Sequence, residues 1–181
     1  MIEAARSLIR ERGLNATAIA DVLERSGAPR GSVYFHFPGG KAQLATEAAA
    51  AHAHDQVRMI DEFAAESSSA AEFIERYVDA GRDGMLDSGF GRGCGLAPLV
   101  TEGPHDVEDL AETGRQGFTE MVDRVAFHFV AFGIGRTAAR SLADAVIAGM
   151  EGAMITSRAF RSPSAWDSMK QSLLAYEKSV R

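Results

Sequence analysis

Residues 27–40, GAPRGSVYFHFPGG, place the tightest constraint on how this chain folds. Pro29 has no backbone N–H to donate, so it suits the first turn of a helix, and the Pro-Gly-Gly sequence at 38–40 stops that helix from continuing. We therefore predict a helix of barely two turns from Pro29 to Phe37. At about 100° per residue, Val33 and Phe37 share one side of this helix, which we expect to be buried.

Two helices are predicted before this short one. The first starts with apolar residues at helical spacing and ends at Gly13, and the second runs from Thr17 to Arg25. Thr17 has the hydroxyl of an N-cap residue, and Gly27 supplies the turn into the third helix. Two short helices joined by a tight turn that contains glycine form a helix-turn-helix, whose second helix reads the major groove of DNA.

The outer side of the third helix carries the groups that such a contact requires. Gly31 lets the backbone approach DNA closely, Ser32 has a hydroxyl for a phosphate or a base, and Arg30 can bind guanine through two hydrogen bonds. We expect Tyr34 to place its ring in the core and its hydroxyl on a phosphate, and Lys41 to bind phosphate. A solvated helix face is the alternative. The predicted DNA contacts are Thr17, Arg30, Gly31, Ser32, Tyr34, Phe35, His36 and Lys41.

Charge is divided unevenly along the chain. The net charge is −6, yet residues 1–45 carry six basic and four acidic residues, which leaves −8 for residues 46–181. This asymmetry favours a small DNA-binding head, residues 1–45, on an acidic body, residues 46–181, with chance clustering as the alternative. A single cysteine, Cys94, excludes an internal disulfide, and no apolar run reaches the roughly 20 residues of a membrane span, so we expect a cytoplasmic protein.

Helical spacing of apolar residues continues through the body. Ser69 is a predicted N-cap, the glycine-rich residues 87–98 are expected to form a loop, and a short helix is expected before residues 102–106. With the head, this makes about nine helices, and the predicted fold class is all-α. The long helices of the body are predicted at 41–65, 70–86, 107–132, 137–160 and 164–178.

A set of residues with fixed spacing spans the head: Gly13, Thr17, Asp21, Gly27, Gly31, Tyr34, His36, Phe37 and Lys41. This set resembles the DNA-binding signature of the tetracycline-repressor (TetR) family of transcriptional regulators. FPGGKAQL at 37–44, GCGL at 93–96 and AGMEGAMITSRAFRS at 148–162 resemble the LmrA and YxaF branch of that family. The resemblance implies a three-helix DNA-binding head, a helical body that binds an inducer, and a homodimer formed through the last two helices. Pro29 and Phe35 replace residues that are commonly polar in relatives, which implies that one or two phosphate contacts are absent.

In that family an apolar cavity of the body receives the inducer, which implies a lining of adaptable methionine and rigid aromatic side chains. Ordinary core packing is the alternative for each candidate, and Cys94 is expected to be a buried thiol rather than a redox sensor. Because the body is acidic and lacks clustered Arg or Lys, we expect a hydrophobic or aromatic inducer that is neutral or cationic. The candidates are Met59, Phe63, Tyr77, Met85, Cys94, Phe118, Met121, Phe129, Met150 and Met154.

The last two predicted helices carry the features of a dimer interface. Each glycine inside the helix at 137–160 costs about 1 kcal/mol relative to alanine, so the close approach of another helix is expected to offset it. Apolar residues of the last helix repeat at alternating spacings of three and four. Packing within one chain is the alternative. The predicted interface comprises Ala145, Gly149, Gly152, Ala153, Trp166, Met169, Leu173 and Tyr176.

The function that these patterns predict is a ligand-responsive transcriptional regulator, a repressor that its inducer releases from a palindromic operator. The sequence contains no Ser-His-Asp set, glycine-rich phosphate loop, carboxylate pair or metal-ligand spacing at usable positions, so we expect no enzyme activity, cofactor or metal. One alternative is a helical small-molecule-binding protein or enzyme with a vestigial DNA-binding head. Another is an activator or a DNA-binding protein that responds to no ligand.

Overall fold

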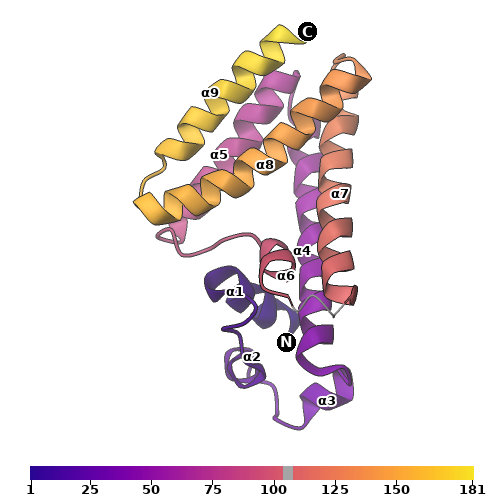
Figure 1. Cartoon of the computed structure of the whole chain (residues 1–181), viewed down its shortest axis with the longest axis vertical. Coiled ribbons are helices and arrows are strands. Elements are labelled where there is room, and N and C mark those ends of the chain that lie inside the picture. The colour runs from indigo at the N-terminus through magenta and orange to yellow at the C-terminus, as the bar shows by residue number, and fades with distance from the viewer. Residues whose placement is uncertain (104–107) are drawn as a thin grey trace. The chain divides into compact units, whose positions relative to one another are not determined.

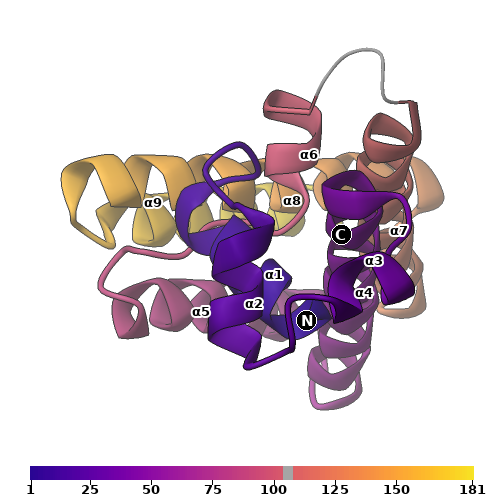
Figure 2. The same cartoon turned by 90° about the horizontal axis from the view of Figure 1, so that it is seen from below.

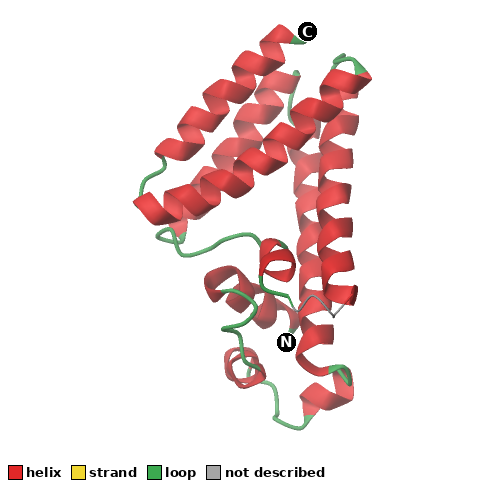
Figure 3. Cartoon of the chain, in the orientation of Figure 1, coloured by secondary structure: helices red, strands yellow, loops and turns green. Residues whose placement is uncertain are grey.

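The computed structural model describes residues 1–103 and 108–181, and this part of the chain folds into nine α-helices without a strand (Figure 1; Figure 3). The prediction of an all-α fold is therefore confirmed. Within the same residues, no helix is long and apolar enough to cross a membrane. The helices are α1 (Ile2–Arg12), α2 (Ile19–Ser26), α3 (Ser32–His36), α4 (Gly40–Ala65), α5 (Ala70–Asp87), α6 (Ala97–Thr101), α7 (Glu108–Ala131), α8 (Arg136–Phe160) and α9 (Ser164–Ser179).

Local signals in the sequence set most of the helix ends. Gly13 follows α1 with a φ of 88°, a conformation that suits glycine, and the Ser69 hydroxyl accepts the Glu72 N–H at the start of α5. The predicted start of a helix at residue 107 lies outside the described residues. The predicted start of α3 at Pro29 is wrong, because the N–H and the hydroxyl of Ser32 both donate to the Pro29 carbonyl and form a turn there.

Two compact units make up the chain. Unit 1 comprises Met1–Asp55 and Cys94–Phe118, and unit 2 comprises Gln56–Gly93 and Thr119–Arg181. Helices α4 and α7 contribute residues to both units. The predicted boundary of the DNA-binding head at residue 45 remains a prediction.

Unit 1 holds α1, α2 and α3 together with the first turns of α4 (Figure 2). Val33 is fully buried and Phe37 is 5% exposed, as the spacing of the short helix predicts. These two side chains attach α3 to the rest of the unit. The other buried apolar residues of these helices and of the turns between them include Ala5, Leu8, Ile9, Leu14, Val22, Leu44 and Ala45.

Unit 2 contains a layer of three helices in which glycines permit close packing. Helices α8 and α9 run antiparallel side by side, and α5 packs against both (Figure 1). A Cβ atom at Gly81 of α5 would lie 2.6 Å from Cζ3 of Trp166, and one at Gly149 of α8 would lie 2.6 Å from the sulfur of Met169. Both glycines therefore let α9 approach a neighbouring helix of the same chain.

The contact between Gly81 and Trp166 gives the first prediction. Gly81→Ala forces the indole ring to move, and overpacking of this kind lowers the free energy of unfolding by about 1 to 3 kcal/mol. Gly84→Ala in the same helix is the matched control, because no atom in the described part of the chain lies within 4 Å of a Cβ atom there. Because alanine has a higher helix propensity than glycine, Gly84→Ala raises the free energy of unfolding by up to about 1 kcal/mol. Thermal and urea unfolding of both variants check the prediction, and an equal effect of the two substitutions would contradict it.

Candidate nucleic-acid interface

Helix α3 presents most of its side chains to solvent. Phe35 is 82% exposed and Tyr34 is 67% exposed, and His36 is exposed next to them. Arg30 and Gly31, which precede the helix, are exposed as well. The structure therefore brings together six of the predicted DNA-contacting residues on one short segment, with Ser32 half-buried at its start.

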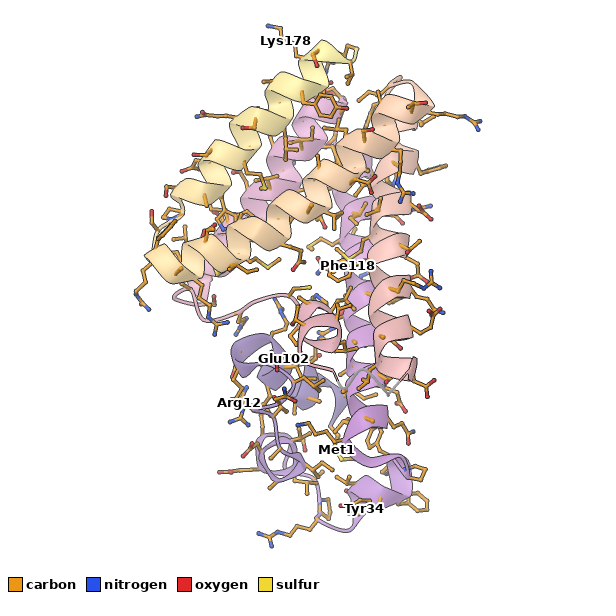
Figure 4. The ribbon with its side chains drawn as sticks, in the orientation of Figure 1. Met1, Arg12, Tyr34, Glu102, Phe118 and Lys178 are labelled. Atoms are coloured by element: carbon orange, nitrogen blue, oxygen red, sulfur yellow. The ribbon has the colours of Figure 1, made fainter. Side chains whose placement is uncertain are left out.

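The Tyr34 ring does not lie in the core, so that prediction is wrong. Val33 and Phe37 already occupy the buried side of α3, and Tyr34 follows Val33 by about 100° around the helix. Its side chain, labelled in Figure 4, instead lines an open crevice of about 670 Å³ between α2 and α3. The crevice is also lined by Ile19, Ala20, Leu23, Glu24, Gly27, Ala28 and Arg30.

Thr17 does not cap α2, which corrects a second prediction. The residue is 4% exposed, and its hydroxyl donates to the Gly13 carbonyl at 2.7 Å, across the turn between α1 and α2. Ala18 is the N-cap, and its N–H donates to the carboxylate of Asp21 at 3.2 Å. The Asp21 carboxylate thus accepts the N–H of the N-cap residue, which is a different hydrogen bond from the one that we expected Thr17 to form.

Ion pairs within unit 1 leave two positive charges beside α3. Arg30 is exposed and Lys41 is half-buried, and neither forms an ion pair with residues in the described part of the chain. One of these cations lies two residues before α3, and the other lies five residues after it. They are therefore the cations of the head that are available to phosphates or bases around this helix. Arg6, Arg12 and Arg25, in contrast, pair with Asp55, Asp21 and Glu11, respectively.

Glu102 fixes the turn between α1 and α2 from a distant part of the sequence. Its carboxylate accepts the Asn15 N–H at 2.9 Å, and its backbone carbonyl accepts the side-chain amide of Asn15 at 3.3 Å. A Cβ atom at Gly13 would lie 2.3 Å from the Glu102 carboxylate. The Asn15 carbonyl in turn accepts a hydrogen bond from the Lys41 ammonium at 3.3 Å. Sequence reasoning missed Glu102, since no local pattern links residues 87 positions apart.

Unit 1 also contains a buried histidine, His52 of α4. His52 is 5% exposed, and a Cβ atom at Gly95 would lie 2.6 Å from its imidazole ring, so the glycine allows the loop to pack on the ring. Burial, together with the positive charges of Arg10 and Arg6, lowers the pKa of His52 to about 4, although the nearby Asp55 opposes the shift. His52 is therefore neutral at physiological pH.

The predicted ligand-binding residues are divided between the two units. Tyr77 and Phe129 both pack against Phe73, with ring centroids 5.7 Å and 5.6 Å apart, and Phe63 lies 6.3 Å from Tyr77. Cys94 and Phe118 belong to unit 1, and the other eight candidates belong to unit 2. Among the candidates in unit 1, Cys94 is buried. Among those in unit 2, Met85, Met121 and Met150 are buried, whereas Met59 and Met154 are half-buried.

The predicted dimer residues differ in how much surface they leave to a second chain. Trp166, Leu173 and Ala153 are 1%, 5% and 4% exposed within the single chain, and Gly149 faces Met169 of the same chain. Ala145, Met169 and Tyr176 are half-buried. Gly152 is exposed, and no atom of residues 1–103 or 108–181 lies within 4 Å of a Cβ atom built at this position.

Comparison with protein families assigns both parts of the chain. The model of the tetR family of bacterial regulatory proteins matches residues 1–48, and the model of the C-terminal domain of LmrA/YxaF-like transcriptional regulators matches residues 70–172. The chain belongs to the TetR family. It is thus a DNA-binding transcriptional regulator and not an enzyme, as the sequence predicts.

Individual TetR-family proteins support this assignment. An uncharacterised HTH-type transcriptional regulator of Mycobacterium tuberculosis is 35% identical over 178 residues, which cover 96% of this chain and 90% of that protein. The regulator LmrA of Bacillus subtilis is 48% identical over 48 residues, or 26% of each chain. A TetR regulator from Legionella pneumophila has the same fold, with a TM-score of 0.86 at 18% identity over 99% of this chain and 95% of that one. CifR, a TetR-family regulator solved with a 26 bp operator, has a TM-score of 0.79 at 18% identity, over 99% of this chain and 95% of that one.

The low pKa of His52 gives a prediction for the stability of the regulator. Between pH 6.5 and 4 the unfolded state binds a proton at this position that the folded state does not, so stability falls as the pH falls through this range. A shift from 6.5 to about 4 corresponds to a loss of about 3 kcal/mol over the whole range. Unfolding measured at pH 7 and pH 5 should show about 2 kcal/mol of this loss in the wild type and a smaller loss in His52→Gln. His54→Gln, at an exposed position of α4, should behave as the wild type, and an equal pH dependence in all three proteins would contradict the prediction.

Proposed function

We propose that this regulator is a homodimeric repressor that leaves a palindromic operator when a small hydrophobic ligand binds its C-terminal body. The observation that carries the proposal is the exposed α3, which in the described part of the chain is preceded by an arginine and followed by a lysine that form no ion pair. A short helical segment with small and polar residues fits the major groove. In this assignment Arg30 binds a base edge and Lys41 binds a phosphate.

Dimerisation is proposed through the outer face of α8, together with α9. Ala148, Gly152 and Ile155 share one side of α8, since they follow one another at spacings of four and three residues, and all three are exposed. A glycine inside a helix costs about 1 kcal/mol relative to alanine. The packing of Met169 accounts for Gly149, but no group among the described residues of the same chain accounts for Gly152. Close approach of the partner's helix would account for it.

The charge of the body supports a neutral or cationic inducer. In the described part of the chain, most of its basic residues pair with carboxylates, which disfavours a phosphorylated metabolite as the ligand. The buried methionine and aromatic side chains of unit 2 favour an apolar ligand. The ligand must bind more tightly to a conformation in which the two heads no longer match successive major grooves. The pairs in unit 2 include Arg58–Glu62, Arg76–Glu72, Arg82–Asp79, Arg124–Asp61, Arg140–Asp144, Lys170–Asp79 and Arg181–Glu177.

Two substitutions separate the proposed phosphate contact from the proposed base contact. Lys41→Ala should weaken binding to all DNA sequences about equally and lower the slope of log K against log salt by roughly one. Arg30→Ala should weaken binding to the selected operator by about 5- to 150-fold and affect scrambled DNA much less. Lys178→Ala, which removes an exposed charge of α9, is the control and should leave both quantities unchanged. An unchanged slope for Lys41→Ala, or an equal loss on scrambled DNA for Arg30→Ala, would contradict the respective contact.

Gly152→Leu tests the proposed dimer face. The leucine side chain enters open space in the single chain, so the fold is retained, but it holds the partner's helix away. We expect sedimentation velocity to show a monomer and operator affinity to drop, because specific binding requires two half-sites. Gly84→Leu makes the same change at another helical glycine without neighbours within 4 Å and should remain dimeric. A folded Gly152→Leu protein that is still fully dimeric would exclude this face.

The inducer class is tested with a compound panel. A hydrophobic or aromatic compound, neutral or cationic, should raise the melting temperature of the protein and lower its affinity for the operator, since both effects follow from one preference between two conformations. Thermal shift and fluorescence anisotropy with labelled operator measure the two effects on the same samples. If only a phosphorylated metabolite produced both effects, or if a broad apolar panel produced neither, the proposed inducer class would be wrong.

A further inference from the structure

Phe35 is the most exposed of the large hydrophobic side chains in the described part of the chain, at 82%. It contributes nothing to the core of unit 1, because Val33 and Phe37 attach α3 from the other side of the helix. It also does not line the crevice between α2 and α3, which Tyr34 does. A single exposed hydrophobic residue is common on protein surfaces, so the position of Phe35, rather than its exposure alone, calls for a function.

The surroundings of Phe35 are polar and point to DNA. Its ring meets the His36 imidazole edge to face, with centroids 5.1 Å apart and an interplanar angle of 87°, and Arg30 lies before the same helix. In the proposed function this side of α3 faces base edges. A phenyl ring has no hydrogen-bond donor or acceptor, so it cannot replace the contacts that a base or phosphate makes with water.

One apolar group projects from base edges into the major groove, and that is the C5-methyl group of thymine. An aromatic ring beside it removes apolar surface of both groups from water without leaving a polar group unsatisfied. We propose that Phe35 contacts the C5-methyl group of a thymine in each operator half-site and selects thymine at that position. The inference rests on the proposed function, in which α3 reads the operator, and adds the base that one of its residues recognises.

Uracil in place of thymine tests this contact, because deoxyuridine lacks only the methyl group and keeps the pairing and the hydrogen-bonding edge. In an operator selected from random DNA, each thymine is replaced by deoxyuridine in turn, and binding is measured for the wild type and Phe35→Ala. At one position in each half-site, the replacement should weaken the wild type about fourfold, as expected for one buried methyl group. Phe35→Ala should weaken binding to the thymine operator by at least as much and should lose nothing further with deoxyuridine.

His36→Ala is the matched control, because it removes the exposed ring next to Phe35 on α3. This variant should retain the wild-type sensitivity to deoxyuridine. Circular dichroism should show that both variants are folded, as their exposed side chains predict. The inference is overturned if no thymine is sensitive to replacement, or if Phe35→Ala remains as sensitive as the wild type. It is also overturned if Phe35→Ala weakens operator and random DNA equally, since the ring then packs on the backbone or between bases.

The same measurements distinguish a failure of this inference from a failure of the proposed function. If Arg30→Ala, Phe35→Ala and His36→Ala all bind the operator as the wild type does, α3 does not read DNA and both proposals are wrong. If Arg30→Ala loses affinity and the methyl groups have no effect in any protein, α3 reads the operator and the thymine contact alone is wrong.

Discussion

The burial of Val33 and Phe37 is the interaction on which the DNA-reading surface depends. Helix α3 has five residues, whereas isolated helices shorter than about 12 to 15 residues are marginal in water. The helix therefore exists because these two side chains enter the core of unit 1. Since two anchors are sufficient, the remaining side chains of α3 face outward, and the exposure of Tyr34 and Phe35 follows from this arrangement.

Ion pairs within unit 1 determine where its positive charge is available to DNA. The net charge of residues 1–45 is small, and several of their arginines are held by carboxylates of the same unit. This pairing concentrates the available positive charge at Arg30 and Lys41, next to α3. Glu102 and Asn15 hold the turn to which Lys41 is hydrogen-bonded, so a residue of the segment after α6 helps to orient a proposed phosphate contact.

Local chemistry made much of the fold predictable, and long-range contacts account for the rest. The cap at Ser69, the end of α1 at Gly13 and the buried pair in α3 each follow from residues a few positions apart. Thr17 and Tyr34 were assigned wrongly, because spacing alone does not show which of two neighbouring groups takes a cap or a core position. Glu102 was missed because its partners lie far away in the sequence. Gly149 and Gly152 cannot be distinguished by sequence pattern. The structure distinguishes them, because Met169 packs against Gly149 and no described atom lies within 4 Å of a Cβ atom at Gly152.

Selection of bound fragments from a random DNA library by the purified protein tests whether this TetR-family chain reads a two-fold symmetric operator through α3. We expect enrichment of one inverted repeat, with half-site centres about one helical turn apart or slightly more, roughly 10 base pairs or above. Enrichment of no sequence, or of a single half-site without its inverted copy, would exclude a two-fold symmetric operator for this protein.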